Sequence, residues 1–309
     1  MPKFLKKIFH KLFYLPQYNI GIIDADISCF LDDFQPKILW LTKPNYLKFF
    51  ANPFSFSANN KTYILFQEYC QLNKRGKIML AELLENSSKK QFLGKKQLLL
   101  DNFQYLSYPF IFSQNNNIFL LCTSYKKKNL ILYQIDTINL ETIFIKEIFS
   151  HHEAINPTLF FYNNIYWLFY TKSDQPNSHL YLAYSQSLQE NFMLHPQNPI
   201  KVSKVSTRPA GNIFMINNKI YRPAQNCLNS YSESIVINEI THLNSQFFSE
   251  QEVAKINNKH LNKYNLGINT IAKTTLNNKN YTLVDGYQEI FVFYKPLISF
   301  FGNILKNLY

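Results

Sequence analysis

The chain has 309 residues, a formal net charge of +12 and a pI of about 9.3. Hydrophobic residues make up 46% of it and aromatic residues 17%, which is enough for a substantial buried core and excludes a disordered protein. The positive charge favours an anionic partner, either a membrane surface, a phosphorylated sugar or nucleic acid, and the alternative is a lysine-rich solvated surface.

The N-terminal residues 2–14, PKFLKKIFHKLFY, place apolar side chains at helical spacing with lysines between them. The pattern predicts a basic amphipathic helix over residues 1–16. Two interpretations stay open: the helix lies at the surface of an anionic membrane, making peripheral contact through residues 1–14, or it packs on the protein or on a partner chain. No apolar run reaches the length of about 18 residues that a transmembrane helix needs, and the segregated regions of a signal peptide are missing.

Two strands are predicted at residues 19–24 and 37–44. One sequence pattern then occurs five times along the chain. Each unit has an apolar strand, a double-asparagine turn and a second strand, which is the pattern of a tight β-hairpin because asparagine tolerates φ > 0. The units are NPFSFSANNKTYILF from Asn52, YPFIFSQNNNIFLLC from Tyr108, NPTLFFYNNIYWLFYT from Asn156, RPAGNIFMINNKIYRPA from Arg208 and NTIAKTTLNNKNYTLVDG from Asn269.

The turns fall at residues 59/60, 116/117, 163/164, 217/218 and 277/278, about 47 to 60 residues apart. A repeat of this length with hairpin chemistry in every unit predicts an all-β fold, a five-bladed β-propeller over residues 17–290. Further strands of the blades are predicted at residues 76–83, 130–136, 179–185 and 234–240. Helical apolar spacing from Leu297 to Leu308 predicts a second amphipathic helix within residues 291–309.

The innermost strands of a propeller converge on a central funnel, so the first residue of each unit is expected to face it. Together with two residues of a second strand, these give the ligand-binding candidates Asn52, Tyr108, Asn156, Arg208, Arg222, Gln225 and Asn269. Amides and a guanidinium suit a hydroxyl-rich or anionic ligand, and the alternative is that they only satisfy the backbone near the axis. Glu68 is the one carboxylate at an inward position and the only catalytic candidate, with a salt-bridge partner as the alternative.

No metal site or cofactor is expected. His151, His152 and Glu153 are adjacent, and adjacent residues of a strand face opposite sides. The four cysteines, Cys29, Cys70, Cys122 and Cys227, are far apart, which indicates neither a zinc site nor a disulfide framework and favours a reducing compartment. The sequence therefore predicts a cytoplasmic protein, with peripheral contact at the inner face of the membrane as an open alternative. No nucleic-acid-binding signature is present, so no nucleic-acid partner is expected.

The sequences of several segments resemble those of a known family. At NYLKFFANPFSF, YLSYPFIF, INPTLF…YWLFYT, LYLAYSQSL, HPQNPIKV, TRPAGNIF and YRPAQNC, within residues 17–288, the chain resembles the N-terminal domain of plant glucosamine inositolphosphorylceramide transferase and its bacterial relatives. That domain is similar to the five-bladed propellers of arabinanase- and xylosidase-type glycoside hydrolases. The resemblance implies a surface-polysaccharide or glycolipid context, a sugar or glycolipid ligand, and a glycosyltransferase partner.

The chain departs from the family pattern where that pattern has acidic residues. The family motifs ADPF and DPTLF have an Asp where this chain has Asn52 and Asn156. The family pattern also has an acidic residue near Thr123, an Asp near Asn226 and a His near Asn269. The related hydrolases have a Glu acid in the fourth blade, where this chain reads RPAG from residue 208. Glycoside hydrolysis normally needs two carboxyl groups flanking the bond, so these replacements argue against ordinary hydrolysis but not against binding.

Three hypotheses for function follow. The leading one is a carbohydrate-binding or carbohydrate-processing propeller that acts in glycan or glycolipid assembly. The second is an active glycosidase or glycosyltransferase that uses Glu68 as its acid or base. The third is a non-catalytic scaffold whose basic helix docks on a membrane or on a glycosyltransferase.

Overall fold

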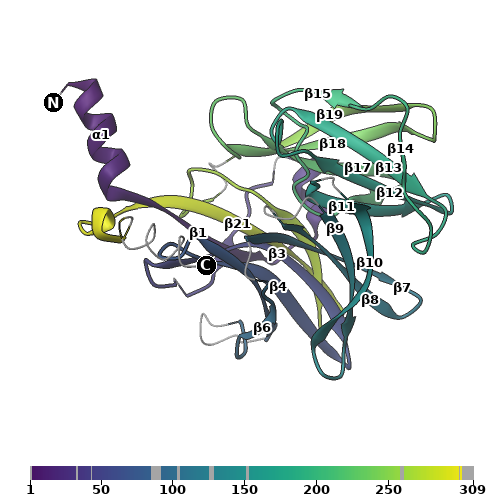
Figure 1. The fold of residues 1–309 in the computed structure, drawn as a ribbon, viewed down its shortest axis with the longest axis horizontal. Coiled ribbons are helices and arrows are strands. Elements are labelled where there is room, and N and C mark those ends of the chain that lie inside the picture. The colour runs from purple at the N-terminus through teal and green to yellow at the C-terminus, as the bar shows by residue number, and fades with distance from the viewer. Residues whose placement is uncertain are drawn as a thin grey trace.

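The computed structural model describes residues 2–32, 34–42, 44–84, 92–102, 105–124, 129–150, 153–257, 261–298 and 300. Its strands form five antiparallel sheets arranged around a common axis, a five-bladed β-propeller (Figure 1). The predicted fold class is therefore confirmed.

Four blades are each built from a continuous stretch of chain, and the first strand of each unit is the innermost strand of its blade. Blades 1 and 2 have four strands each: β3 (Lys48–Ala58), β4 (Lys61–Cys70), β5 (Arg75–Glu82) and β6 (Gln97–Leu100) in blade 1, and β7 (Leu106–Gln114), β8 (Asn117–Ser124), β9 (Asn129–Asp136) and β10 (Glu141–Ser150) in blade 2. Blade 3 has five: β11 (Ile155–Tyr162), β12 (Ile165–Thr171), β13 (His179–Ser185), β14 (Met193–Leu194) and β15 (Lys201–Val202). Blade 4 has four: β16 (Phe214–Ile216), β17 (Lys219–Asn226), β18 (Ser234–Leu243) and β19 (Phe248–Asn257).

The fifth blade joins the two ends of the chain. Its sheet order is β2-β1-β21-β20, in which β20 (Ile271–Leu276) and β21 (Lys279–Phe291) come from the last repeat unit. The outer strands β1 (Tyr14–Ile23) and β2 (Ile38–Trp40) come from the beginning of the chain. The short 3-10 helix η1 (Ile27–Leu31) lies between them in sequence. β1 pairs with β21 along its whole length. The predicted strands near residues 19–24 and 37–44 are thus the elements that close the ring.

The double-asparagine turns have the backbone conformation that their composition predicts. Both asparagines have positive φ in all five turns, for example 50° and 58° at Asn163 and Asn164. The second turn lies at Asn115–Asn116, one residue before the predicted position, because β8 begins at Asn117. Three consecutive asparagines occur here, so composition alone could not fix the register.

The N-terminal helix α1 (Lys3–Phe13) stands away from the blades and runs directly into β1 (Figure 1). At the other end of the chain, residues 295–298 are helical, and most of the helix predicted up to Leu308 lies outside the described residues. No helix in the described part of the chain is both long and apolar enough to cross a bilayer.

Candidate functional site

The innermost strands bend where each repeat unit begins. Asn52, Tyr108 and Asn156 have φ values of 53°, 52° and 50°, and each directly precedes a proline. In each of their blades the strand register shifts at this point, which marks a β-bulge. Proline has no N–H, so the extra residue leaves one donor fewer to satisfy near the axis. Tyr108 is a bulky residue in the left-handed region, a conformation that persists only when the surrounding structure holds it.

A second set of polar side chains lies at the end of each unit, on the neighbouring strand. This second-strand ring consists of Gln67, Thr123, Thr171, Gln225 and Asp285, all of them buried. Of these five, sequence reasoning selected only Gln225 as a ligand-binding candidate, although the shared position in the repeat was available as a signal.

Members of the second-strand ring reach across to the first strand of the next blade. The Nε2 of Gln67 donates to the carbonyl of Leu106 at 3.0 Å, and the Nε2 of Gln225 donates to the carbonyl of Asn269 at 3.0 Å. The hydroxyl of Thr123 accepts the backbone N–H of Asn156 at 2.9 Å. The ring therefore ties successive blades together at the axis.

Asp285 performs this task between the last blade and the first. Its carboxylate accepts the backbone N–H groups of Asn52, Asn269 and Thr270 at 2.8, 2.9 and 2.8 Å. Burial raises the pKa of Asp285 to about 6, although the hydrogen bonds from these donors oppose the rise. This carboxylate was missed by sequence reasoning, because one of its three donors, the N–H of Asn52, lies 233 residues away in sequence.

The predicted residues Asn52, Asn156, Arg208, Gln225 and Asn269 are brought together around the axis by direct contacts. Arg208 donates to the amide oxygen of Asn156 at 3.3 Å and to that of Asn177 at 3.1 Å, and its guanidinium lies 5.2 Å from the ring centre of Tyr231. Two of these partners are amide oxygens and the third is the π face of a tyrosine.

Three buried polar atoms near the axis have no hydrogen-bond partner among the described residues: the side-chain oxygens of Gln225 and Asn269 and the hydroxyl of Thr171. Each belongs to a side chain that is at most 4% exposed. Burying an acceptor without a donor costs free energy, so these atoms indicate a place where a donor from outside the chain would be accommodated.

Four tyrosines gather near the buried carboxylate of Asp285. The ring centres of Tyr18 and Tyr287 are 4.9 Å apart, and Tyr231, Tyr287 and Tyr105 are electrostatic neighbours of the Tyr18 hydroxyl. Burial, and to a lesser extent these neighbours, raises the pKa of Tyr18. We refer to Tyr18, Tyr105, Tyr231 and Tyr287 as the tyrosine rim. Such side chains offer an apolar face and a polar tip to a ligand.

Tyr108 and Arg222, also predicted as ligand contacts, are fully occupied by protein groups. The hydroxyl of Tyr108 lies 2.8 Å from the hydroxyl of Thr158 and accepts the backbone N–H of Gly211 at 2.8 Å, which joins three blades. Arg222 makes a two-pronged ion pair with Glu250, at 2.7 and 2.6 Å.

The ion pair of Arg222 and Glu250 includes a second cation, because Lys201 lies 2.6 Å from the same carboxylate. Burial opposes ionisation of Glu250, but Arg222 and Lys201 outweigh it, so the pKa of this carboxyl lies below its usual value. Arg222 and Glu250 are almost completely buried. The cluster joins the fourth blade to Lys201 of the third, and its charges are paired within the protein.

Glu68 faces away from the axis. It neighbours Gln67, and adjacent strand residues point to opposite sides. Its carboxylate pairs with Lys48 at 2.8 Å and with Lys96 at 3.8 Å, and it lines a lateral cavity of about 360 Å³. It is therefore not grouped with the other predicted site residues.

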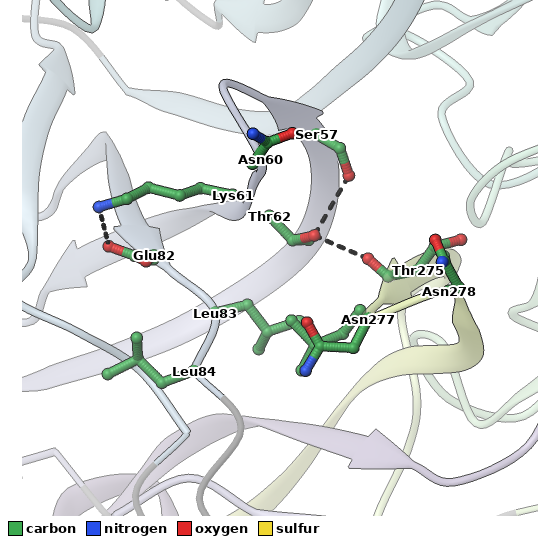
Figure 2. Close-up of a pocket in the computed structure, with 11 residues that line it drawn as sticks. Ser57, Asn60, Lys61, Thr62, Glu82, Leu83, Leu84, Thr275, Asn277 and Asn278 are labelled. Carbon is green, nitrogen blue, oxygen red and sulfur yellow. Dashed lines mark hydrogen bonds and ion pairs between the residues drawn. The ribbon is translucent and has the colours of Figure 1, made fainter.

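A separate cavity of about 480 Å³ lies at the opposite end of the inner strands, between blades 1 and 5 (Figure 2). Thr62 donates to the carbonyl of Thr275 at 2.7 Å, and Lys61 pairs with Glu82 at 3.0 Å (Figure 2). The contact of Thr62 with Thr275 fastens the seam between the first and last blades, and the pair of Lys61 and Glu82 lies within blade 1. No cluster of three or more metal-binding side chains occurs among the described residues, and His151 and His152 lie outside them.

Comparisons with known proteins agree with this architecture. The family model described as glucosamine inositolphosphorylceramide transferase 1, N-terminal, matches residues 42–284. The glucosamine inositolphosphorylceramide transferase 1 of Oryza sativa subsp. indica is 29% identical over 211 residues, which are 66% of this chain and 28% of that protein. The one from Arabidopsis thaliana is 26% identical over 215 residues, 66% of this chain and 27% of that protein. The chain thus spans less than a third of the length of these relatives.

Solved structures with the same fold are sugar-cleaving enzymes by their descriptions. Zg3597, a family 117 glycoside hydrolase of Zobellia galactanivorans, has a TM-score of 0.55 at 10% identity and covers 90% of this chain and 91% of its own. The GH43_1 enzyme of Xanthomonas citri has a TM-score of 0.53 at 12% identity and covers 77% of this chain and 91% of its own. At these identities the likeness shows the fold alone.

Proposed function

The chain belongs to the family of the N-terminal region of glucosamine inositolphosphorylceramide transferase 1, and on this premise we propose that its axial funnel binds a carbohydrate in glycan or glycolipid assembly. The observation that carries the proposal is the pair of buried, unpartnered acceptors, Gln225 Oε1 and Asn269 Oδ1. A sugar hydroxyl is a donor that satisfies such atoms.

The surrounding groups fit the same class of ligand. Amides and the guanidinium of Arg208 offer both donors and acceptors, and the tyrosine rim offers flat apolar surface to the faces of a sugar ring. The guanidinium of Arg208 is a fixed cation with planar donors, a group that suits the carboxylate or phosphate of a ligand.

Binding, rather than hydrolysis, is the role that we propose. Asn52 and Asn156 present amides at the axis, and an amide can neither accept the proton nor form the intermediate of glycoside hydrolysis. The one carboxylate of the second-strand ring, Asp285, is fully buried and is engaged by backbone N–H groups. The glycosyl transfer named in the plant relatives would then fall to another domain or protein, to which this propeller presents a sugar.

Thermal unfolding of the full chain against a panel of neutral sugars, uronic acids, nucleotide sugars and inositol phosphates tests the proposal. A ligand at about 100 times its Kd stabilises the folded state by about 2.7 kcal/mol, a readily measured shift in Tm. A panel without any stabilising sugar would overturn the proposal.

Two variants locate the ligand. Asn269→Ala removes an unpartnered acceptor and should weaken the hit about tenfold, the worth of one hydrogen bond. Arg208→Ala should weaken an anionic sugar more than a neutral one. Asn139→Ala, an exposed asparagine in the turn after β9, is the matched control and should leave affinity unchanged. Retained affinity in both funnel variants would place the ligand elsewhere.

A further inference from the structure

The N-terminal helix α1 exposes a stripe of apolar side chains. Phe4, Leu5, Ile8 and Leu12 are between 40% and 72% exposed. Residues four positions apart lie on one face of a helix, so these four form a continuous strip on the side of α1. The helix projects from the propeller, and the strip is not covered by any blade (Figure 1).

The same helix is strongly basic. Its sequence, KFLKKIFHKLF, contains four lysines and no acidic residue. Lys7 and Lys11 are exposed and, at 100° per residue, flank the strip on the side of Phe4. An apolar strip flanked by cations is the pattern of a helix that lies in the interface of a membrane with anionic lipid.

The helix is held in a fixed relation to the propeller by the other end of the chain. Phe9 and Phe13 contact the ring of Phe291 with centres 6.1 and 5.9 Å apart. Lys295 donates to the carbonyl of Lys11 at 2.6 Å, a favourable place for a cation at the end of a helix. The neighbouring Phe293, whose ring centre is 6.4 Å from that of Phe13, is 76% exposed and extends the apolar surface.

We propose that α1, together with Phe293, docks on the surface of an anionic lipid bilayer. The apolar strip enters the boundary between headgroups and acyl chains, and the lysines of α1 remain among the anionic headgroups. This proposal goes beyond carbohydrate binding and does not depend on it. Charge complementarity favours lipid over a second copy of this chain, because two copies would bring two basic helices together.

Docking would also orient the funnel. β1 begins immediately after α1, and its fifth residue, Tyr18, belongs to the tyrosine rim. The rim thus lies at the end of the propeller that carries α1. A sugar attached to a membrane lipid would reach the funnel from that side.

Co-sedimentation of the full chain with vesicles tests the docking. We expect binding to vesicles of phosphatidylcholine with about one third phosphatidylserine, and none to phosphatidylcholine alone, because the cations respond to surface charge. Ile8→Glu combined with Leu12→Glu should abolish binding. The matched control is Ile138→Glu, an 83% exposed isoleucine in the turn after β9, and it should bind like the wild type.

The charge contribution is tested separately. Lys7→Glu combined with Lys11→Glu should reduce partitioning at least about thirtyfold, which corresponds to about 1 kcal/mol for each lysine. All these side chains are exposed, so the variants should keep the wild-type Tm.

Three results would overturn the proposal: no binding to the anionic vesicles, equal binding to neutral vesicles, or unchanged binding by Ile8→Glu with Leu12→Glu. A dimer in size-exclusion chromatography that this double variant dissolves would assign the strip to a second copy and would also overturn it. Sugar binding measured without vesicles stays the same in every case, so failure of docking and failure of the funnel are distinguishable.

Discussion

The carboxylate of Asp285 accepts the backbone N–H of Asn52 at 2.8 Å, although 233 residues separate them in sequence. This contact fastens the last blade to the first near the axis. Within the last blade, the pairing of β1 with β21 joins the beginning of the described chain to its end.

Asp285 should make stability depend on pH in an unusual direction. Its pKa is about 6 in the folded state and near 3.8 when unfolded, so the folded state binds more protons between these values. Stability from this group is full below about pH 4 and declines by up to about 3 kcal/mol as pH rises through 6. Urea unfolding between these pH values should show the decline in the wild type and not in Asp285→Asn. Asp136→Asn, in an exposed turn, should retain it; an unchanged profile in Asp285→Asn would exclude Asp285 as the titrating group.

The buried ion cluster of blade 4 should be sensitive to loss of its acid. Glu250→Gln leaves Arg222 and Lys201 without their counter-charge, and breaking such a buried pair costs about 3–5 kcal/mol. Glu82→Gln is the matched control, because Glu82 pairs with Lys61 at the surface, where solvent screens the interaction, and its loss should change stability little. Equal losses in denaturant unfolding would show that burial does not set the strength of the cluster.

Gly211 should tolerate no side chain. Its φ is 135°, and a Cβ there would lie 1.6 Å from the carbonyl oxygen of Ile271 in the next blade. We expect Gly211→Ala to destabilise the fold by more than about 4 kcal/mol or to prevent folding. Gly94→Ala, where the nearest atom would be 3.4 Å away, should change Tm little. A wild-type Tm for Gly211→Ala would mean that blades 4 and 5 can separate without cost.

Glu68→Gln distinguishes the funnel from the lateral cavity. Because Glu68 pairs with Lys48 and Lys96 outside the axis, affinity for a funnel ligand should stay within about twofold of the wild type. Lys48→Gln offers a control that disrupts the same pair from the other side. Affinity is measured by titration calorimetry. A large loss of sugar affinity in Glu68→Gln would show that the ligand binds in the cavity around Glu68 and would make Glu68 a catalytic candidate again.

Local patterns in the sequence were sufficient to predict the blades. Asparagine pairs such as Asn163–Asn164 determine their own turns through their tolerance of positive φ, and alternating aromatic residues determine the strands beside them. These are short-range properties, which explains why the hairpins were predicted with nearly correct boundaries.

Contacts between distant segments were not predictable in the same way. Nothing in the residues around Asp285 reveals that it will be buried, since its partner Asn52 approaches only when the ring closes. Glu68 and Gln67 are neighbours in sequence and face opposite sides of β4. The register shift at Asn52 determines which of the two side chains joins the second-strand ring. The tyrosine rim, likewise, gathers residues from both ends of the chain.

The composition of the fifth blade sets the order in which the molecule can fold. Blades 1 to 4 each consist of contiguous residues and can form as soon as those residues leave the ribosome. β1 is synthesised long before its partner β21. The edge of β1 that pairs with β21 therefore stays unpaired during nearly all of synthesis. Loop-closure entropy over the whole intervening chain makes this pairing slow. Until β21 is made, the edge of β1 that pairs with it has unsatisfied backbone groups, and such an edge is a place where two chains can associate.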